Sequence, residues 1–340
     1  MQIDLIVDLQ YGSTGKGLLA GYLAETFEHD TVATCNMPNA GHTYIDSLGN
    51  KMIHKVLPNG IISPNLERVL IGPGAVFDEG RLYEEIDAAL ELGYLEEAMI
   101  FIHPNAMVLR PEHRQMEQAT LSGIASTMQG SMAATTEKMV RDPNKPCLAR
   151  DVLVPKRPGV VVLDNNSWME QVGRSRKILA EGSQGFSLGV NQRFHPYCTS
   201  RECTPYRLLS DMALPQITVN TWGTLRTYPI RVGNTSDGYS GSVHSDQAEI
   251  SFEDIGQEVE TTTVTGRPRR IFTFSHSQLE EALWHCRPDH LFLNFANYME
   301  PVSLGALSEQ IDTIASEFGC KIDLYGYGPT FYDVRHAHTR

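Results

Sequence analysis

Residues 2–23 read QIDLIVDLQYGSTGKGLLAGYL: an apolar run, a glycine-rich turn and a second apolar segment. The pattern predicts a β-strand over residues 3–7, a turn over residues 10–17 and then a helix. Such a turn surrounds phosphate oxygens with backbone N–H groups and a helix N-terminus. Lys16 adds a positive charge suited to β and γ phosphates. The stretch therefore predicts a phosphate-binding loop after the first strand of an α/β fold.

The turn is a variant of the common phosphate loop G-x-x-x-x-G-K-[ST]. Gln10 stands where that pattern has its first glycine, and Gly17 replaces the hydroxyl residue that usually meets Mg²⁺. An ordinary glycine turn is the alternative for these letters alone. The position of the turn directly after the first strand favours a phosphate loop.

Short β-rich runs alternate with segments of helical spacing along the rest of the chain. Further strands are predicted over residues 69–71, 99–102, 159–163, 178–180, 217–219 and 290–295. Helices are predicted over residues 79–92, 277–285 and 303–318. This alternation predicts an α/β fold with a mostly parallel central sheet flanked by helices.

No repeat, low-complexity tract or long linker divides the chain, so residues 1–340 are predicted to form a single domain. Polar, glycine-rich stretches occupy residues 36–50, 123–136, 183–205 and 231–247. Their length is typical of long functional loops.

The chain carries 28 basic and 41 acidic residues, a formal net charge of −13. This excess of acid disfavours direct nucleic-acid binding, although local cationic groups can still hold a small anion. No apolar run approaches the roughly 18 residues of a membrane span, and the N-terminus shows no leader pattern. We expect no membrane contact and a location in the cytoplasm.

The six cysteines form no C-x-x-C pair, which disfavours a disulfide framework or a zinc site. The twelve histidines show no H-E-x-x-H spacing, so no histidine metal site is predicted. His42 lies within the string NAGHT at residues 39–43. A lone loop histidine is more often structural than catalytic, and only this string favours a functional role.

The turn at 10–17 and the string at 39–43 together resemble the adenylosuccinate synthetase family, whose hallmarks are Q-W-G-D-E-G-K-G and N-A-G-H-T. The likeness continues in the family's order through most of the chain. The further matches are Ser126-Thr127, Glu137-Lys138 with Arg141, EGSQG at 181–185, HPYCTS at 195–200, RVG at 231–233, TVTGRPRR at 263–270 and Gly328-Pro329. The resemblance implies a P-loop-like α/β ligase that uses a purine triphosphate and Mg²⁺ to couple L-aspartate to a purine monophosphate.

The resemblance also implies roles for matching positions. Lys16 and the loop amides would hold the triphosphate, and His42 would polarise the phosphoryl group as it reaches purine O6. The implied triphosphate-binding residues are Gly12, Thr14, Gly15, Lys16, Gly17, Gly41, Thr43, Asn297, Gly328 and Pro329. The implied catalytic residues are Ser13, Lys16, His42 and Gln184, and the implied Mg²⁺ ligands are Ser13 and Gly41.

Two further sites follow from the same resemblance. The implied monophosphate-binding residues are Ser13, Asn39, Ser126, Thr127, Arg141 from a partner subunit, Gln184, Thr199 and Val232. The implied aspartate-binding residues are Thr263, Val264, Thr265, Arg267 and Arg269. Guanidinium groups suit that role because they pair bidentately with carboxylates, and a solvated basic loop is the alternative. The shared Arg141 implies a homodimer, for which C₂ symmetry is natural.

The most informative departure from the family is Ser13, which stands where relatives have an aspartate. That carboxylate takes the proton from purine N1 and touches Mg²⁺, and a serine hydroxyl does either poorly. Guanine has an amine at C2, beside N1, that a carboxylate would crowd, whereas Ser13 can accept its N–H. The change resembles the phage-encoded branch of the family, which makes N6-succino-2-amino-2′-deoxyadenylate from dGMP and aspartate for 2-aminoadenine DNA.

A second departure is at residues 293–297, where the family has T-K-L-D. Phe295 replaces the lysine, and Asn297 replaces the aspartate that binds the guanine of GTP. An amide can donate to adenine N1 and accept from its N6 amine, so ATP or dATP is predicted as donor. A shifted strand end, with Asn297 capping a turn, is the alternative.

The loop that binds the 5′-phosphate also departs, because Ala125 and Met128 replace two family glycines. Two rival functions are weighed against the dGMP hypothesis. An ordinary adenylosuccinate synthetase would use IMP and GTP, which Ser13 and Asn297 argue against. A non-catalytic purine-nucleotide-binding protein would bind nucleotide without releasing phosphate.

Overall fold

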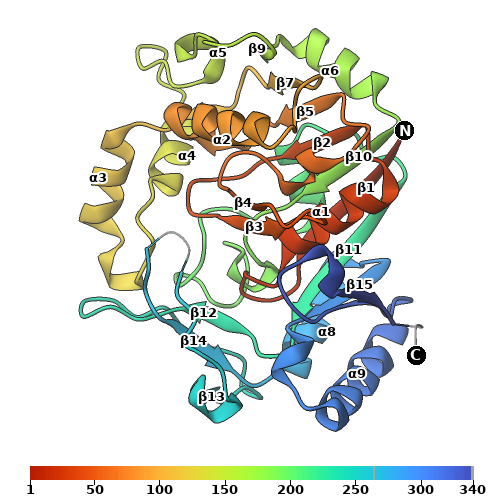
Figure 1. The fold of residues 1–340 in the computed structure, drawn as a ribbon. Helices are drawn as coiled ribbons and strands as arrows, with labels where there is room; N and C mark the ends of the chain where they lie inside the picture. Colours follow the sequence, from red (N-terminus) through yellow and green to blue (C-terminus); the bar gives the residue numbers. More distant parts are fainter. Residues whose placement is uncertain (263–264, 338–340) are drawn as a thin grey trace.

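The computed structural model describes residues 1–262 and 265–337. A ten-stranded sheet has the order β17-β16-β15-β11-β1-β10-β2-β5-β7-β9 (Figure 1). Its strands are β1 (Gln2–Asp8), β2 (Thr31–Thr34), β5 (Arg68–Ile71), β7 (Met99–Ile102), β9 (Val160–Val162), β10 (Lys177–Glu181), β11 (Val219–Arg226), β15 (His290–Asn294), β16 (Ile322–Gly326) and β17 (Val334–His336). Neighbouring strands are parallel except β16 and β17. The predicted α/β fold with a mostly parallel sheet is confirmed.

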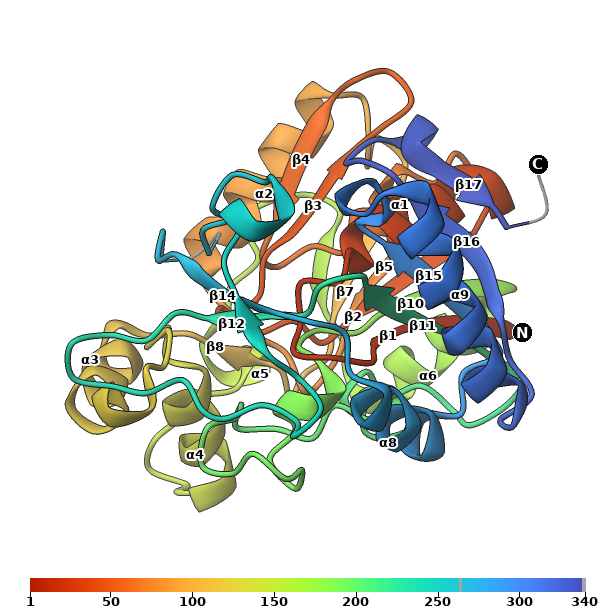
Figure 2. The same ribbon diagram turned by 90° about the horizontal axis from the view of Figure 1, so that it is seen from below.

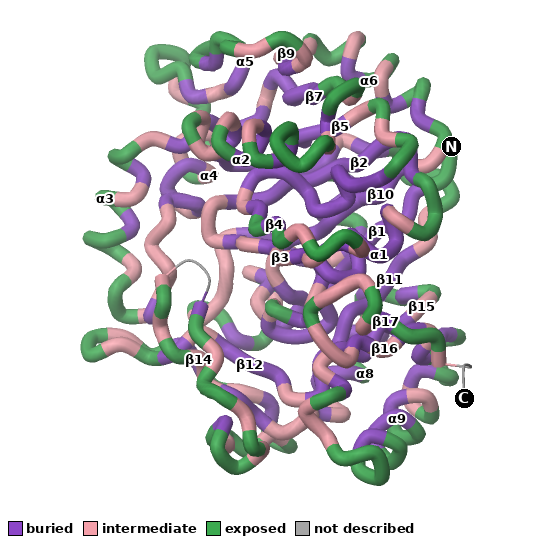
Figure 3. The backbone as a smooth tube through the Cα atoms, viewed as in Figure 1, coloured by how far each residue is buried: buried purple, intermediate pink, exposed green. Residues whose placement is uncertain are grey.

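Helices cover both faces of this sheet (Figures 1 and 2). Along β1, Ile6 packs in one hydrophobic cluster with residues of α1 and α2, whereas Leu5 and Val7 pack in a second cluster with α8 and α9. The helices are α1 (Lys16–Phe27), α2 (Glu79–Glu91), α3 (Pro111–Thr120), α4 (Ser131–Val140), α5 (Ala149–Val152), α6 (Asn165–Arg174), α7 (Pro205–Asp211), α8 (His276–Cys286) and α9 (Pro301–Ser316). Figure 3 shows the central strands buried between these exposed layers. Over the described residues, no helix is both long enough and apolar enough to cross a membrane.

Three small sheets extend the central one. The hairpin of β3 (His42–Ile45) and β4 (Lys51–His54) lies against α1. The second sheet contains β12 (Ile230–Val232), β13 (Glu249–Ile250) and β14 (Arg269–Phe272), and the third pairs β6 (Val76–Phe77) with β8 (Met107–Val108). The first residue of β3 and the start of β14 carry predicted site residues, His42 and Arg269.

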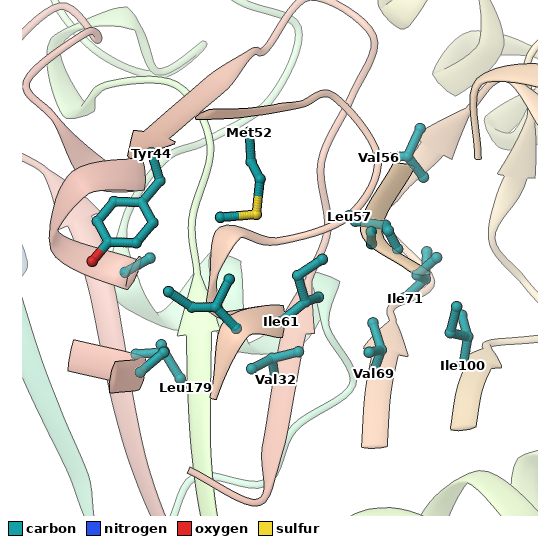
Figure 4. Packing of buried hydrophobic residues seen from close by; sticks show 14 of the residues in the cluster. Val32, Tyr44, Met52, Val56, Leu57, Ile61, Val69, Ile71, Ile100 and Leu179 are labelled. Atoms are coloured by element: carbon teal, nitrogen blue, oxygen red, sulfur yellow. The ribbon is translucent and has the colours of Figure 1, made fainter. Parts of the chain in front are cut away.

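Close packing anchors the hairpin that carries His42. Tyr44 and Met52 pack with Ile61 of the 3₁₀ helix η1 (Asn59–Ile62), above Val32 and Leu179 of the sheet (Figure 4). Each fully buried side chain of this kind contributes about 1.5–3 kcal/mol to folding. A Cβ on Gly21 would lie 2.4 Å from the Tyr44 ring, so α1 approaches the hairpin at a distance that only glycine permits. His42 therefore sits on a rigid element.

The predicted strands at 3–7, 69–71, 99–102, 159–163, 178–180 and 290–295 are confirmed, as are the three predicted helices. The strand predicted at 217–219 is wrong in its bounds, because β11 spans Val219–Arg226. The apolar pattern did not predict most of β11 because the strand contains polar residues. Asn220 donates to Asp4, and the buried Thr224 hydroxyl donates to the Val7 carbonyl. These bonds let polar side chains occupy the centre of a sheet.

Candidate active site at the carboxyl edge of the sheet

A cavity of about 600 Å³ opens where β1, β10 and β15 end. The residues that line it come from segments that are far apart in the sequence. They are Tyr11, Gly12, Ser13, Gly15, Lys16, Gly17, Leu18, Asn39, Ala40, Gly41, His42, Thr43, Thr127, Gln184, Leu188, Val232, Glu260, Thr261, Thr262, Arg269, Asn294, Phe295, Asn297, Tyr298, Gly328 and Pro329. Ligands of open parallel sheets bind at this edge, so the cavity is the candidate active site.

The phosphate loop leads directly from β1 into α1. Ser13 is exposed at the cavity with a left-handed backbone, φ 57°. Gly15 precedes the first helical residue with φ 92°, and a Cβ there would lie 1.9 Å from Nδ2 of Asn294. The loop therefore needs glycine at this point for both its conformation and its contact. The N-terminus of α1 points its free N–H groups at the cavity edge, as phosphate binding requires.

A buried carboxylate, Asp8, organises the loop from beneath. Its Oδ1 accepts hydrogen bonds from the backbone N–H groups of Gln10 (2.9 Å) and Gly12 (3.1 Å). Its Oδ2 accepts from the Thr14 hydroxyl (2.5 Å) and from Nζ of Lys16 (2.9 Å). Sequence reasoning missed Asp8. The available signal was an acidic residue at the last position of a buried strand, which needs partners.

His42 is held by a second buried acid, Glu181, at the end of β10. Its Nδ1 pairs with Oε1 of Glu181, whose side chain is 1% exposed. The other carboxylate oxygen accepts from the backbone N–H of Asn59 at 2.7 Å. This pairing orients the imidazole and leaves its Nε2 free to face an anionic oxygen. The sequence motif contained Glu181, but sequence reasoning gave it no role.

Gln184 reaches the cavity from a segment packed tightly on the phosphate loop. Its own φ is 67°, and a Cβ on the next residue, Gly185, would lie 2.3 Å from the backbone nitrogen of Gly12. The motif at 181–185 thus aligns the Glu181–His42 pair, Gln184 and the phosphate loop as one unit.

The far side of the cavity is lined by Phe295, Asn297, Gly328 and Pro329. Asn294 fixes this side to the phosphate loop: its Nδ2 donates to the Thr14 carbonyl at 3.3 Å and its Oδ1 accepts from the Phe295 N–H at 2.8 Å. Asn297 is exposed at the cavity. A flat aromatic ring beside an amide suits a purine base.

A third side of the cavity is lined by Glu260, Thr261, Thr262 and Arg269. Arg269 is partly buried, and burial lowers the pKa of its guanidinium to about 10. Arg267 donates to the Ser126 carbonyl at 2.9 Å and to the Thr265 hydroxyl at 3.2 Å. Two predicted aspartate-binding residues, Thr263 and Val264, lie outside the described residues. The cations present here match the predicted carboxylate-binding loop in charge.

Several other predicted site residues lie outside the cavity lining: Thr14, Ser126, Arg141, Thr199, Thr265 and Arg267. Thr14 is turned under the loop, where its hydroxyl also contacts the hydroxyl of Thr224. Arg141 is exposed at the end of α4 with φ 58°. The binding roles of these six residues stay predictions.

Buried polar atoms without partners lie on the predicted nucleotide-binding segments. They are Oδ1 of Asn39 and the hydroxyls of Ser183, Thr199 and Ser200. A buried polar atom left unpaired is costly, so a group of them near one cavity favours a polar ligand. Sequence reasoning gave Ser183 and Ser200 no role, although it gave one to their neighbours Gln184 and Thr199.

The oxygens available to Mg²⁺ are few on the protein side. Within the described ranges, no three His, Cys, Asp or Glu side chains gather as a metal site. Ser13 and Gly41 both line the cavity and offer one hydroxyl and one carbonyl oxygen. Mg²⁺ commonly takes few protein ligands and keeps phosphate oxygens and waters. The donor set therefore fits an ion held largely by a bound triphosphate.

Comparison with known proteins agrees with this geometry. The model of the family "Adenylosuccinate synthetase" matches residues 5–156 and 152–303. N6-succino-2-amino-2′-deoxyadenylate synthase of Vibrio phage phiVC8 is 50% identical over 338 residues, covering 98% of this chain and 97% of that one. The same-named protein of Salmonella phage PMBT28 is 41% identical, with 97% and 96% covered.

Two solved structures are also similar. Succinoaminodeoxyadenylate synthetase of cyanophage S-2L, bound to dGMP and to dATP as an energy donor, has a TM-score of 0.91 and 40% identity, with 99% and 96% of the chains covered. Fully ligated adenylosuccinate synthetase of Plasmodium falciparum has a TM-score of 0.72 at 18% identity, which shows the shared fold. The resemblance stated from the motifs is confirmed. The chain belongs to the adenylosuccinate synthetase family.

Proposed function

We propose that this single-domain chain is a ligase that couples L-aspartate to C6 of dGMP. ATP or dATP would drive the reaction through a 6-phosphoryl intermediate, and the product would be N6-succino-2-amino-2′-deoxyadenylate, a precursor of 2-aminoadenine DNA. The observation that carries the proposal is Ser13, a neutral residue exposed at the cavity where the family pattern has a carboxylate. The phage relatives at 41–50% identity, which carry the name of this synthase, support it.

The dGMP site would comprise Asn39, Thr127, Gln184 and Val232, which line one cavity with Ser13. The unpaired hydroxyl of Thr199 supports a polar ligand beside them. The shorter side chain of Ser13 leaves room for the C2 amine of guanine and offers an oxygen that accepts its N–H. An aspartate at that position would put a carboxylate in the same space.

The adenine base of the phosphoryl donor would lie between Phe295 and Pro329, and the side-chain amide of Asn297 would form hydrogen bonds with its edge. An amide can satisfy the N1 acceptor and the N6 donor of adenine together, which a carboxylate cannot. The cyanophage relative of known structure binds dATP as an energy donor, which supports an adenine nucleotide here.

The aspartate carboxylates would be bound by Arg269 and by the neighbouring Arg267, Thr263, Val264 and Thr265. Arg269 lines the cavity and is partly desolvated, which strengthens its attraction for an anion. Arg267 would exchange its present contact with the Ser126 carbonyl for the substrate.

A homodimer would complete the monophosphate site by bringing Arg141 from the partner. Arg141 is exposed and does not line the cavity of its own subunit. The two residues before it, Met139 and Val140, are 71% and 64% exposed. Apolar side chains beside a required cation are typical of a surface that a second subunit covers.

The geometry supports a two-step mechanism. O6 of dGMP would attack the γ-phosphoryl group, the N1 proton would be lost to water and ADP or dADP would depart, while Lys16, the α1 N-terminus and Nε2 of His42 stabilise the transferring charge. Mg²⁺, held by the triphosphate with Ser13 and Gly41, would neutralise part of that charge. The amine of aspartate, oriented by Arg269, would then displace phosphate at C6. Gln184 would orient the purine beside the phosphate loop.

A substrate matrix tests this assignment: IMP, GMP and dGMP against GTP, ATP and dATP, each with aspartate, measured by phosphate release. We expect turnover with dGMP and an adenine nucleotide, and little with IMP. Equal or better use of IMP with GTP would identify an ordinary adenylosuccinate synthetase instead. Nucleotide binding without phosphate release in any combination would indicate a non-catalytic protein.

A further inference from the structure

Arg226 ends β11 beside the phosphate loop, and its side chain is 0% exposed. No step of the proposed mechanism uses it, and it does not line the cavity. A fully buried guanidinium needs several hydrogen-bond partners, because it carries five donors and a fixed charge. Its partners belong to three different sides of the active site.

The first partner is Glu260, which lines the cavity. Nη2 of Arg226 donates to Oε1 at 2.6 Å and Nη1 donates to Oε2 at 3.2 Å, a bidentate pair. Tyr298 also donates its hydroxyl to Oε1 of Glu260, at 3.1 Å. Fork-to-fork pairs of this kind are directional as well as strong, so Arg226 fixes the plane of the Glu260 carboxylate.

The second and third partners are Ser13 and Phe295. Nη1 of Arg226 also donates to the Ser13 carbonyl at 3.3 Å, and Cζ lies 3.8 Å from the centre of the Phe295 ring. The main chain of Arg226 is held in turn by Gln10, whose side chain accepts from its N–H at 3.0 Å and donates to its carbonyl at 3.2 Å. One residue thus contacts the purine side, the donor-base side and the aspartate side.

A second arginine, Arg269, lies next to Glu260: its backbone N–H donates to the Glu260 carbonyl at 2.9 Å, and both residues line the cavity. Burial would raise the pKa of the Glu260 carboxyl, but the attraction of Arg226 and then of Arg269 lowers it overall, so Glu260 is ionised. Arg269 is the cavity-lining arginine that would bind the aspartate substrate. Of the two guanidinium groups, only that of Arg226 is paired with the Glu260 carboxylate, whereas Nε of Arg269 donates to the Thr261 carbonyl at 3.3 Å.

We propose that Arg226 is a positioning residue: by binding Glu260 bidentately it keeps this internal carboxylate away from Arg269, and by donating to the Ser13 carbonyl it fixes the left-handed turn that faces the purine. Without Arg226, Glu260 pairs with Arg269 and competes with the carboxylate of L-aspartate. This inference rests on the proposed function, since it assigns aspartate to Arg269.

The test compares Arg226→Met with the double variant Arg226→Met, Glu260→Gln. At saturating dGMP and ATP, Arg226→Met should raise KM for aspartate at least tenfold, because the freed Glu260 carboxylate pairs with Arg269 in place of the substrate. Removing the Glu260 charge in the same chain should lower that KM again by several-fold. A purely structural loss would make the double variant no better than the single one.

Arg226→Lys provides a second, milder variant if Arg226→Met does not fold. It keeps the charge but loses the bidentate fork, so its KM for aspartate should lie between those of the wild type and Arg226→Met. The matched control is Arg201→Lys. Arg201 is another buried arginine, and it pairs with Asp211. None of the side-chain hydrogen bonds of Arg201 reaches a residue that lines the cavity. Arg201→Lys should lower the thermal midpoint and leave KM for aspartate unchanged.

The outcomes separate the inference from the function beneath it. A wild-type enzyme that releases no phosphate in response to aspartate would overturn the proposed function. A wild-type enzyme that does so, together with an Arg226→Met or Arg226→Lys variant whose KM for aspartate stays within twofold, would overturn only the role of Arg226. A double variant worse than Arg226→Met would do the same.

Discussion

The two faces of the phosphate loop carry different chemistry. The underside presents the buried carboxylate of Asp8 to two backbone N–H groups, the Thr14 hydroxyl and the Lys16 ammonium. The cavity face presents the neutral, exposed Ser13. The acid that organises the loop is therefore separate from the residue that would meet the purine.

This separation explains how the loop can lose the carboxylate of its family pattern without losing its shape. Hydrogen bonds to a charged group are worth about 1.5–3 kcal/mol each, and Asp8 accepts four of them. Ser13 is then free to change with the substrate. The comparison predicts that changes beneath the loop damage turnover broadly, whereas changes on the cavity face alter which substrate is used.

The largest effect is expected for Lys16→Ala, because Lys16 belongs to both faces: it pairs with Asp8 and lines the cavity. We expect kcat to fall roughly 10³-fold, as when a group that stabilises transition-state charge is removed. Stability should also fall by about 3 kcal/mol, since the buried Asp8 carboxylate loses the only cation that pairs with it among the described residues. Phosphate release and thermal unfolding measure the two losses. A kcat within tenfold of wild type would remove Lys16 from the mechanism.

A change confined to the underside comes next, with Asp8→Asn and its control Thr14→Val. Asn keeps the shape of Asp8 but not the charge that holds Lys16, so the loop shifts and kcat should fall roughly 10²-fold. Thr14→Val removes one hydroxyl from the same network and should cost about 1 kcal/mol of stability with a smaller loss of rate. Equal losses of rate in the two variants would mean that the carboxylate has no special role.

A smaller effect is expected on the donor side, where Asn297 is exposed to the cavity like Ser13. In Asn297→Asp, the carboxylate faces the lone pair of adenine N1, while it can accept both N–H groups of guanine. The ratio of kcat/KM for ATP over GTP should therefore fall roughly tenfold, or about 1.4 kcal/mol. Initial rates with each donor give that ratio. An unchanged ratio would place the donor base elsewhere.

The elements and site residues that lie in local sequence patterns were predictable from the sequence. The apolar run before the glycine-rich turn placed β1, the loop and Lys16, and the family strings placed His42 and Gln184. Asp8, Glu181, Arg226 and Glu260 were given no role, because each acts through a partner distant in the chain or on the hidden side of a turn. β11 was misplaced for a related reason: its polar residues are paired across the sheet, which a periodicity of side chains cannot reveal.

The most direct test of the Ser13 assignment compares dGMP with dIMP, two substrates that differ only in the C2 amine. The wild-type enzyme should have a kcat/KM for dGMP at least roughly tenfold higher than for dIMP, the scale of one lost hydrogen bond to a buried polar group. In Ser13→Asp the preference should reverse, because the carboxylate crowds the amine and restores an acceptor for N1–H. A wild-type enzyme that uses dIMP as well as dGMP would contradict the account.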